Sequence, residues 1–487
     1  MIRNRAEAMS CGGCHQNSND TEIAPNVNWP KSRFFVHVDE QGVLSSALTE
    51  QFLPARAALL KDYLQKTTGT TVEKWRFAEV DYSSARNDFG FHNASNNFNN
   101  QAFATLQADG SITAWGNSGN GGTGAPTGSG YTKIYSNRYA FAALKIDGSI
   151  TAWGRSNYGG SGARAPTGSG YVKIYSNSEA FAAIKADGSI TAWGLSSSGG
   201  TGAPTGAWGL SSSGGTGAPT GSGYKKIYSA EYAFAAIKAD GSITAWGDSP
   251  YGGTGAPTDS GYTKISSTWA AFAALKADGS ITAWGDPTYG GSGAPTGSGY
   301  TKIYTNGHAF AAFKADGSIT AWGNSSEGGT GAPTGSGYTK ISSAWAAFAA
   351  LKADGSIKAW GKSDRGGTDA PTDKGYIKIY SNAFAFAALK ADGSITAWGN
   401  SAWGGTAPTG SGYTKIYSNE YAFAALKADG SITAWGNSNY GGIGAPDDSG
   451  YTKIYSTLGA FVAVKADGSI KAWGDPSHGG TTPTVTD

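Results

Sequence analysis

The tetrapeptide Asp-Gly-Ser-Ile occurs ten times in this chain, and any fold must accommodate that repetition. Its aspartates stand at 109, 147, 187, 240, 278, 316, 354, 392, 429 and 467, and all but one of the gaps between them are 37–40 residues. Glycine and tryptophan follow the same period, so that 75 Gly and 16 Trp occur among 487 residues. A fixed period of this length is typical of arrays in which each unit buries its apolar face only against its neighbours.

One unit, residues 413–450, illustrates the pattern: YTKIYSNEYAFAALKADGSITAWGNSNYGGIGAPDDSG. Residues 414–418, 422–427 and 431–435 are rich in β-formers and predict three short strands. Asp429-Gly430 lies between the last two and predicts a two-residue type I′ turn, so we interpret the aspartate as a turn residue and not as a calcium ligand or catalytic acid. The second segment is small or apolar on both sides, which predicts a sheet packed between two others.

Two other repeated features have a structural and a functional interpretation. Trp435 and its equivalents resemble sugar- or cofactor-stacking residues, but one tryptophan per Gly-rich β-unit is more often the core filler of a sheet. The Gly-Gly pair in the tail of each unit predicts a loop. No helix and no Lys-Ser/Thr follow that pair, so a phosphate-binding loop is excluded.

The central phrase Phe-Ala-Ala-Leu-Lys-x-Asp-Gly-Ser-Ile-x-Ala-Trp-Gly, with its later Gly-Gly and Pro, resembles the repeats of the regulator of chromosome condensation family. The repeat length is similar to that of the shorter, three-stranded blades of the β-lactamase inhibitor protein II type. The resemblance covers residues 89–487 and implies a mainly β, propeller-like array that grips other proteins through loops on one rim. Propellers of that family close with seven blades, whereas this chain has ten units. The ten units are therefore compatible with three arrangements: a larger ring, a seven-blade ring with three units left over, or an open spiral.

One gap is longer because residues 192–206 recur letter for letter as residues 207–221. Fifteen residues supply half a hairpin and a loop, but not a whole unit. We expect one copy to form a surface excursion, with Trp193 or Trp208 displaced from the core series.

Residues vary between units at two places, after the first strand and after the Trp-Gly. In an up-down-up unit both places lie at the same end, and the Asp-Gly turns lie at the other. Aromatic side chains are favoured anchors in protein interfaces, although loops also vary where nothing depends on them. The predicted partner-binding residues are Tyr139, Tyr158, Tyr232, Tyr251, Trp269, Tyr289, Trp345, Trp403, Tyr421 and Tyr440.

The N-terminal segment has a different character, and Cys11-Gly-Gly-Cys14-His15 is the attachment pattern of c-type haem. In this hypothesis Cys11 and Cys14 bond the haem and His15 ligates the iron. His37 is the best candidate for the sixth ligand, with His92 behind it, since both methionines precede the motif. A Cys11–Cys14 disulfide, a redox pair, a vestigial site and a metal site are alternatives, but zinc would lack thiols. We expect a partly helical module at 1–65, similar to one of exported bacterial proteins, and a connector at 66–88.

Taken together, these features favour a non-enzymatic interaction scaffold that binds a protein or a glycan. The alternative is a haem electron-transfer or sensor protein with the array as a spacer. Five histidines, none recurring in register, supply no catalytic triad, and the net charge of +2 argues against nucleic acid. Haem attachment and disulfides predict an extracellular, periplasmic or cell-surface location. Because the start lacks a signal peptide and no run of 18 apolar residues follows, we expect a piece of a longer exported protein without a membrane-spanning segment.

Overall fold

The computed structural model describes residues 22–24, 27–28, 99, 102–106, 109–160, 165–200, 217–467, 469–478 and 480–481. The chain divides into two compact units, Met1–Glu73 and Lys74–Asp487. The described residues of the first unit form one antiparallel pair, β1 (Glu22–Ala24) and β2 (Val27–Asn28). The helix expected at 45–64 lies outside the described residues.

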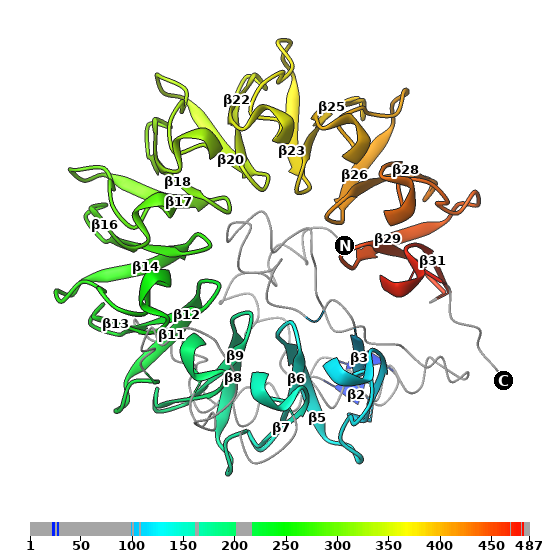
Figure 1. The fold of residues 1–487 in the computed structure, drawn as a ribbon. Coiled ribbons are helices and arrows are strands. Elements are labelled where there is room, and N and C mark those ends of the chain that lie inside the picture. Colours follow the sequence, from blue (N-terminus) through cyan, green and yellow to red (C-terminus); the bar gives the residue numbers. More distant parts are fainter. Residues whose placement is uncertain are drawn as a thin grey trace. The chain divides into compact units, whose positions relative to one another are not determined.

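The second unit contains ten small antiparallel sheets in chain order, which we call blades 1 to 10 (Figure 1). Blade 1 shows two strands in the described residues, and each of the other nine has three with the second strand in the middle. The strands of the first five blades are, for blade 1, β3 (Ala102–Leu106) and β4 (Ile112–Gly116); for blade 2, β5 (Tyr131–Ser136), β6 (Ala140–Lys145) and β7 (Ile150–Gly154); for blade 3, β8 (Tyr171–Ser176), β9 (Ala180–Lys185) and β10 (Ile190–Gly194); for blade 4, β11 (Tyr224–Ser229), β12 (Ala233–Lys238) and β13 (Ile243–Gly247); and for blade 5, β14 (Tyr262–Ser267), β15 (Ala271–Lys276) and β16 (Ile281–Gly285). The strands of the other five are, for blade 6, β17 (Tyr300–Thr305), β18 (Ala309–Lys314) and β19 (Ile319–Gly323); for blade 7, β20 (Tyr338–Ser343), β21 (Ala347–Lys352) and β22 (Ile357–Gly361); for blade 8, β23 (Tyr376–Ser381), β24 (Ala385–Lys390) and β25 (Ile395–Gly399); for blade 9, β26 (Tyr413–Ser418), β27 (Ala422–Lys427) and β28 (Ile432–Gly436); and for blade 10, β29 (Tyr451–Ser456), β30 (Ala460–Lys465) and β31 (Ile470–Gly474). The predicted mainly β array of three-stranded blades is confirmed.

A short helical turn follows the last strand of every blade. Most of these turns follow a residue whose side chain or backbone carbonyl accepts a hydrogen bond from a backbone amide of the turn. In blade 8, for example, the Asn400 side chain accepts a hydrogen bond from Ala402 N at 3.1 Å. The turns are η2 (Ser118–Asn120), η3 (Ser156–Tyr158), η4 (Ser196–Ser198), η5 (Ser249–Gly253), η6 (Pro287–Tyr289), η7 (Ser325–Glu327), η8 (Ser363–Arg365), η9 (Ser401–Trp403), η10 (Ser438–Tyr440) and η11 (Pro476–His478).

The turn at Asp-Gly differs from the sequence prediction. The Gly430 amide donates to the Lys427 carbonyl at 3.0 Å, and Lys427 N donates to the Ser431 carbonyl at 3.0 Å. Only Gly430 has a positive φ (80°), so the connection is a three-residue loop and the two-residue type I′ turn is wrong. Asp429 Oδ1 accepts from Ser431 N (2.9 Å) and Ser431 Oγ (2.7 Å), which confirms that this aspartate is a turn residue.

Each blade is centred on a stacked Phe–Trp pair from its second and third strands. Phe423 and Trp435 are cross-strand partners, and their ring centroids lie 5.2 Å apart. Trp153, Trp193, Trp246, Trp284, Trp322, Trp360, Trp398, Trp435 and Trp473 are all at most 7% exposed, so the described tryptophans of this series fill the core as predicted.

The Gly-Gly pair belongs to the junction between blades. The indole Nε1 of Trp435 donates at 3.1 Å to the carbonyl of Gly404, which ends the turn of the preceding blade. A Cβ added at Gly404 would lie 2.6 Å from the Phe423 ring, so glycine is required for the blades to approach. The same bond recurs at the other described junctions except that of Trp246, whose buried Nε1 has no acceptor among the described residues.

That exceptional junction is where the 15-residue duplication falls. β10 and η4 use the first copy, and Trp193 is buried at 1% exposure in the regular core position. Residues 201–216, which include Trp208, lie outside the described residues, and the predicted displacement of one tryptophan stays a prediction.

Candidate functional site: the variable rim

The two places that vary between units meet at one end of each blade. One is the loop after the first strand, and the other is the short helical turn after the third; together we call them the variable rim. In blade 9, Tyr421 of the loop lies 4.4 Å from Tyr440 of the turn between ring centroids. The same contact is made by Tyr139 with Tyr158 (4.3 Å) and by Phe384 with Trp403 (4.6 Å). The predicted meeting of the two variable places is therefore observed.

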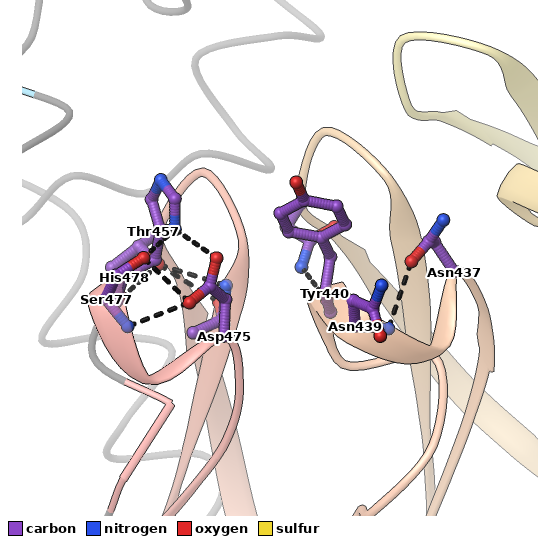
Figure 2. Close-up of polar contacts among 9 residues, drawn as sticks. Asn437, Asn439, Tyr440, Thr457, Asp475, Ser477 and His478 are labelled. Atoms are coloured by element: carbon purple, nitrogen blue, oxygen red, sulfur yellow. Dashed lines mark hydrogen bonds and ion pairs between the residues drawn. The ribbon is translucent and has the colours of Figure 1, made fainter.

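A buried asparagine ties the loop to the turn. Asn419 is fully buried; its Nδ2 donates to the Tyr440 carbonyl at 2.6 Å, and its Oδ1 accepts from Tyr421 N and Ala422 N. Thr457 replaces it in blade 10 and donates to the His478 carbonyl at 2.8 Å. Figure 2 shows the result, with Tyr440 and His478 projecting from the same end of two successive blades.

The loops are also joined to one another from blade to blade. Arg138 N donates to the Ser178 carbonyl in the next blade, and Ser178 N donates to the Glu231 carbonyl in the blade after that. Eight such backbone hydrogen bonds run without a break from blade 2 to blade 10, ending with Glu420 N and the Leu458 carbonyl. Because their backbone amides are hydrogen-bonded in this way, the loops hold their variable side chains in fixed positions relative to those of the neighbouring blades.

Contacting rim positions vary together. Where the loop presents Glu179, the turn presents Ser198, whose Oγ donates to the carboxylate at 2.8 Å. Where the loop presents His308, the turn presents Glu327, with Nδ1 3.2 Å from the carboxylate oxygen. In blades 5 and 7 the large residue is one position earlier, at Trp269 and Trp345, and an alanine follows it. Loops that drifted freely would not place complementary polar groups opposite each other in this way.

The aromatic residues form two clusters. The first contains Trp269, Tyr289, His308 and Trp345, and the two tryptophan rings lie 5.9 Å apart with the histidine beside both. The second runs from blade 8 to blade 10 through Phe384, Trp403, Tyr421, Tyr440 and His478. Arg365 lies over the Phe384 ring at 4.2 Å and extends the second cluster into blade 7.

A polar segment lies beside the first cluster. Glu231 is 3% exposed; Arg138 Nη2 lies 2.7 Å from its Oε1 as an ion pair without hydrogen-bond alignment, and Trp269 Nε1 donates to its Oε2. Burial raises the pKa of Glu231, while Arg138 and the Trp269 hydrogen bond oppose that rise. Burial likewise raises the pKa of Glu179, and the Ser198 hydrogen bond opposes it.

Asp248 begins the turn of blade 4, but it lacks the side-chain hydrogen bond that its carboxylate and amide equivalents make. Its equivalents Asp286 and Asn324 accept from the backbone amide two residues later. In blade 4 that residue is Pro250, which has no N–H, and the buried Asp248 Oδ1 is left without a hydrogen bond. Burial raises the pKa of Asp248 accordingly.

All ten predicted partner-binding residues lie on the variable rim and are half-buried. Tyr139 pairs with Tyr158, Tyr232 with Tyr251, and the other six belong to the two clusters. The sequence interpretation did not select Phe384, Arg365, His308 and His478, although they occupy the same variable positions. Comparing contacting pairs of variable positions would have found them, because each completes a pair or cluster.

The haem residues cannot be placed. Cys11, Cys14, His15 and His37 lie outside the described residues, so the proposed haem attachment and the iron ligand His15 rest on sequence alone. In the described parts of the array, no group of three or more His, Cys, Asp or Glu side chains is arranged to hold a metal ion. Among the described residues, no helix has the length and hydropathy needed to cross a membrane.

Comparison with solved structures gives distant likenesses. No protein-family model matches the chain, and no curated protein matches it. The ectodomain of the receptor kinase CR4 from Physcomitrella patens is 16% identical over 52% of this chain and 71% of its own, with a TM-score of 0.33. The CRINKLY WD40 ectodomain of the Arabidopsis thaliana receptor kinase ACR4 is 16% identical over 52% and 93%, with a TM-score of 0.31. Prp20p from Saccharomyces cerevisiae is 16% identical over 44% and 72%, with a TM-score of 0.30.

Proposed function

We propose that this chain is a non-enzymatic scaffold that binds a partner protein through its variable rim. The single observation that carries the proposal is the matched variation of contacting rim positions on an otherwise repeated blade. The scaffold residues, such as the core Trp435 and the bridging Asn419, hold that variable surface at a fixed geometry. Partly exposed Tyr, Trp and Arg side chains on a rigid support are favoured anchors of protein interfaces.

The chemistry of the rim favours a protein over a glycan. A repeating glycan would be matched by the same residue in every blade. The rim instead changes from the acidic segment of Glu179 and Glu231 to the Trp-rich first cluster, and then to the second cluster with Arg365. Such heterogeneity along one surface suits a protein epitope, which has no repeat. An extracellular or cell-surface location, inferred from the N-terminal cysteines, accompanies the proposal.

The test uses the full chain and two sets of four substitutions in the same blades. The rim set is Tyr158→Ala, Tyr251→Ala, Tyr289→Ala and Trp403→Ala. The control set is Lys145→Ala, Lys238→Ala, Lys276→Ala and Lys390→Ala, at the ends of second strands beside the Asp-Gly turns. Partners selected from displayed protein and glycan libraries against the unmodified chain are then measured against both sets.

We expect a selected protein partner to lose at least about tenfold in affinity for the rim set, because hot-spot aromatics carry most of the binding energy. The control set should bind as the unmodified chain does. Affinity retained by the rim set, or lost equally by both sets, would contradict the rim as the binding surface. Selection of glycans alone would contradict the protein partner.

A further inference from the structure

The two histidines of the described array both lie on the variable rim, one in each aromatic cluster. His308 Nδ1 lies 3.2 Å from Glu327 Oε2, and His478 Nδ1 lies 2.8 Å from Asp475 Oδ2. Figure 2 shows the second of these pairs. Histidine is the side chain whose charge ordinarily changes between about pH 5 and pH 8. The rim therefore contains two carboxylate-paired groups that respond to mild acid.

His308 is the more deeply enclosed of the two. Its side chain keeps 9% of its surface exposed, against 18% for His478. The imidazole stacks on the Tyr289 ring at 5.4 Å between centroids. It also lies 6.0 Å from the Trp269 ring and 6.2 Å from the Trp345 ring. His308 thus stands beside every other aromatic ring of the first cluster.

The neighbours of Nδ1 identify the nitrogen that takes up a proton. Nδ1 faces two acceptors, the Glu327 carboxylate and the Trp345 carbonyl at 3.4 Å. That carbonyl is held in place because it also accepts from Gly307 N at 3.0 Å. A ring nitrogen between two acceptors carries its hydrogen in the neutral and the charged form alike. No described residue forms a hydrogen bond with His308 Nε2, so acid adds the second proton there.

Burial and two charged side chains decide the charge of His308. Burial lowers the pKa of His308 below its ordinary value. Glu327 of η7 opposes that shift, as does the Trp345 carbonyl, whereas Lys362 at the start of η8 adds to it. The imidazole is therefore neutral near pH 7.5 and becomes charged in acid.

The rest of the first cluster does not change its charge over the same range. Burial chiefly, with the charges of Asp286 and Glu327, raises the pKa of Tyr289, so its phenol stays neutral. The loops that carry the two tryptophans contain no titratable side chain at 268–270 and 344–346. His308 is thus the titrating member of the cluster.

Three other ionisable groups lie next to the cluster. Glu231 accepts a hydrogen bond from Trp269, and burial raises the pKa of this carboxyl. Asp364 and Arg365 of η8 form an ion pair with each other. A change at His308 alone leaves these groups in place, so it separates the titration of the histidine from theirs.

We propose that protonation of His308 releases a partner protein bound at the first cluster, so that the rim holds its partner at neutral pH and loses it in mild acid. This inference rests on the protein binding proposed for the rim and adds its regulation. A partner that covers the cluster removes water from the exposed part of the imidazole. The charged imidazole is then less stable in the complex than in the free chain, because a charge is buried without a new counter-charge.

The direction of the pH dependence follows from that difference. The pKa of His308 is lower in the complex than in the free chain, so binding in acid requires the release of one proton. Affinity is constant well above the free-chain pKa and falls as the pH decreases through it. The loss is at most about tenfold for each pH unit, as for any single linked proton.

The probe is a protein partner selected from a displayed library against the full chain at about pH 7.5. It is kept for the test only if Tyr289→Ala weakens it at least about tenfold, which places it on the first cluster. Its dissociation constant is measured from about pH 7.5 to about pH 5 with the unmodified chain, His308→Gln, Glu327→Gln and His478→Gln. Each protein is compared with itself across the range, and thermal unfolding confirms that each is folded. His478→Gln is the matched control, since it removes the other rim histidine.

We expect the unmodified chain and His478→Gln to lose about five- to tenfold in affinity over that range, and His308→Gln less than about twofold. With Glu327→Gln the loss should begin at lower pH, since the carboxylate that opposes the lowering of the His308 pKa is gone. A histidine that only fills space would not produce that displacement.

Equal losses in the unmodified chain and His308→Gln would assign the pH dependence to Glu231 or to the partner and would overturn the proposal. Affinity that is independent of pH, or that rises in acid, would also overturn it but would leave the rim as a binding surface. Failure to find any partner that depends on Tyr289 would contradict binding at the first cluster itself, and the proposal would fall with it.

Discussion

Arg138 pairs with Glu231 across an entire blade: its Nη2 lies 2.7 Å from Glu231 Oε1, although the residues belong to blades 2 and 4. The Glu231 side chain is 2% exposed, so its charge depends on this partner and on the Trp269 indole. The ion pair links the loops of blades 2 and 4, which the backbone hydrogen bonds also join through Ser178 of blade 3.

Removing Arg138 should therefore destabilise the array. We expect Arg138→Ala to lower the free energy of unfolding by about 2–4 kcal/mol, because a buried carboxylate loses its counter-charge. Adding Glu231→Gln should recover part of that loss. Arg155→Ala, which removes an exposed arginine lying over Tyr139 and Tyr158, should cost less than about 1 kcal/mol. Denaturant unfolding measures all three, and equal losses for the two arginines would contradict the buried pair.

The Gly-Gly junction can be tested with two glycines of equal φ. Gly404 and Gly410 both have φ of 104°, but only Gly404 has neighbours where a Cβ would stand. Both alanine variants strain the backbone, and Gly404→Ala also forces the Phe423 ring away. We expect Gly404→Ala to be less stable than Gly410→Ala by about 1–3 kcal/mol in thermal unfolding. Equal stability would show that the junction accommodates a side chain.

Blade 8 offers a core and a rim tryptophan for comparison. Trp398 is 3% exposed and donates to the Gly366 carbonyl at 3.0 Å, whereas Trp403 is half-buried on the rim. Trp398→Phe should cost about 1–3 kcal/mol, since a hydrogen bond is lost and a cavity opens. Trp403→Phe should change stability by less than about 0.5 kcal/mol. The opposite ranking would contradict the assignment of one tryptophan to the core and the other to the binding surface.

Stability should fall as the pH rises through the titration of Glu179. Burial raises its folded pKa above that of the unfolded chain, so between the two values the folded chain binds more protons. The free energy of unfolding then decreases with rising pH across that window and stays low above it. Glu179→Gln should gain about 0.5 kcal/mol near pH 7.5, after allowance for its partial exposure, and much less near pH 4. A gain independent of pH would rule out titration as the cause.

The haem hypothesis is tested by absorption spectroscopy. The chain, exported in a host that attaches haem c, should show a Soret band that survives denaturation because the bond is covalent. Cys14→Ala should abolish that covalent band. A colourless protein would exclude haem attachment and leave the cysteines as a disulfide or an idle motif.

The blades were predictable because local signals decide them. The unit at 413–450 was expected to form strands at 414–418, 422–427 and 431–435, and β26, β27 and β28 match within one residue. The Asp-Gly turn was assigned the wrong type because the dipeptide is compatible with a two-residue type I′ turn and also with a three-residue hairpin loop. Which one forms depends on whether Ala428 joins the turn, and that is set by strand register.

The rim was predictable in position but not in detail. Variation within the chain located Tyr421 and Tyr440, and the up-down-up order placed them at one end. The Arg138–Glu231 pair could not be foreseen, since it joins residues 93 positions apart.

The tryptophan-to-glycine bond that closes nearly every described junction has an evolutionary consequence. Because Trp435 contacts Gly404 in the same way as Trp398 contacts Gly366, the two faces of one unit already fit those of any other. Recombination between units can therefore delete, insert or reorder blades and still join complementary surfaces. Rearrangement of whole units would thus change the order of the rim residues, and the exact copy at 207–221 shows that a shorter stretch of the sequence has been duplicated in place.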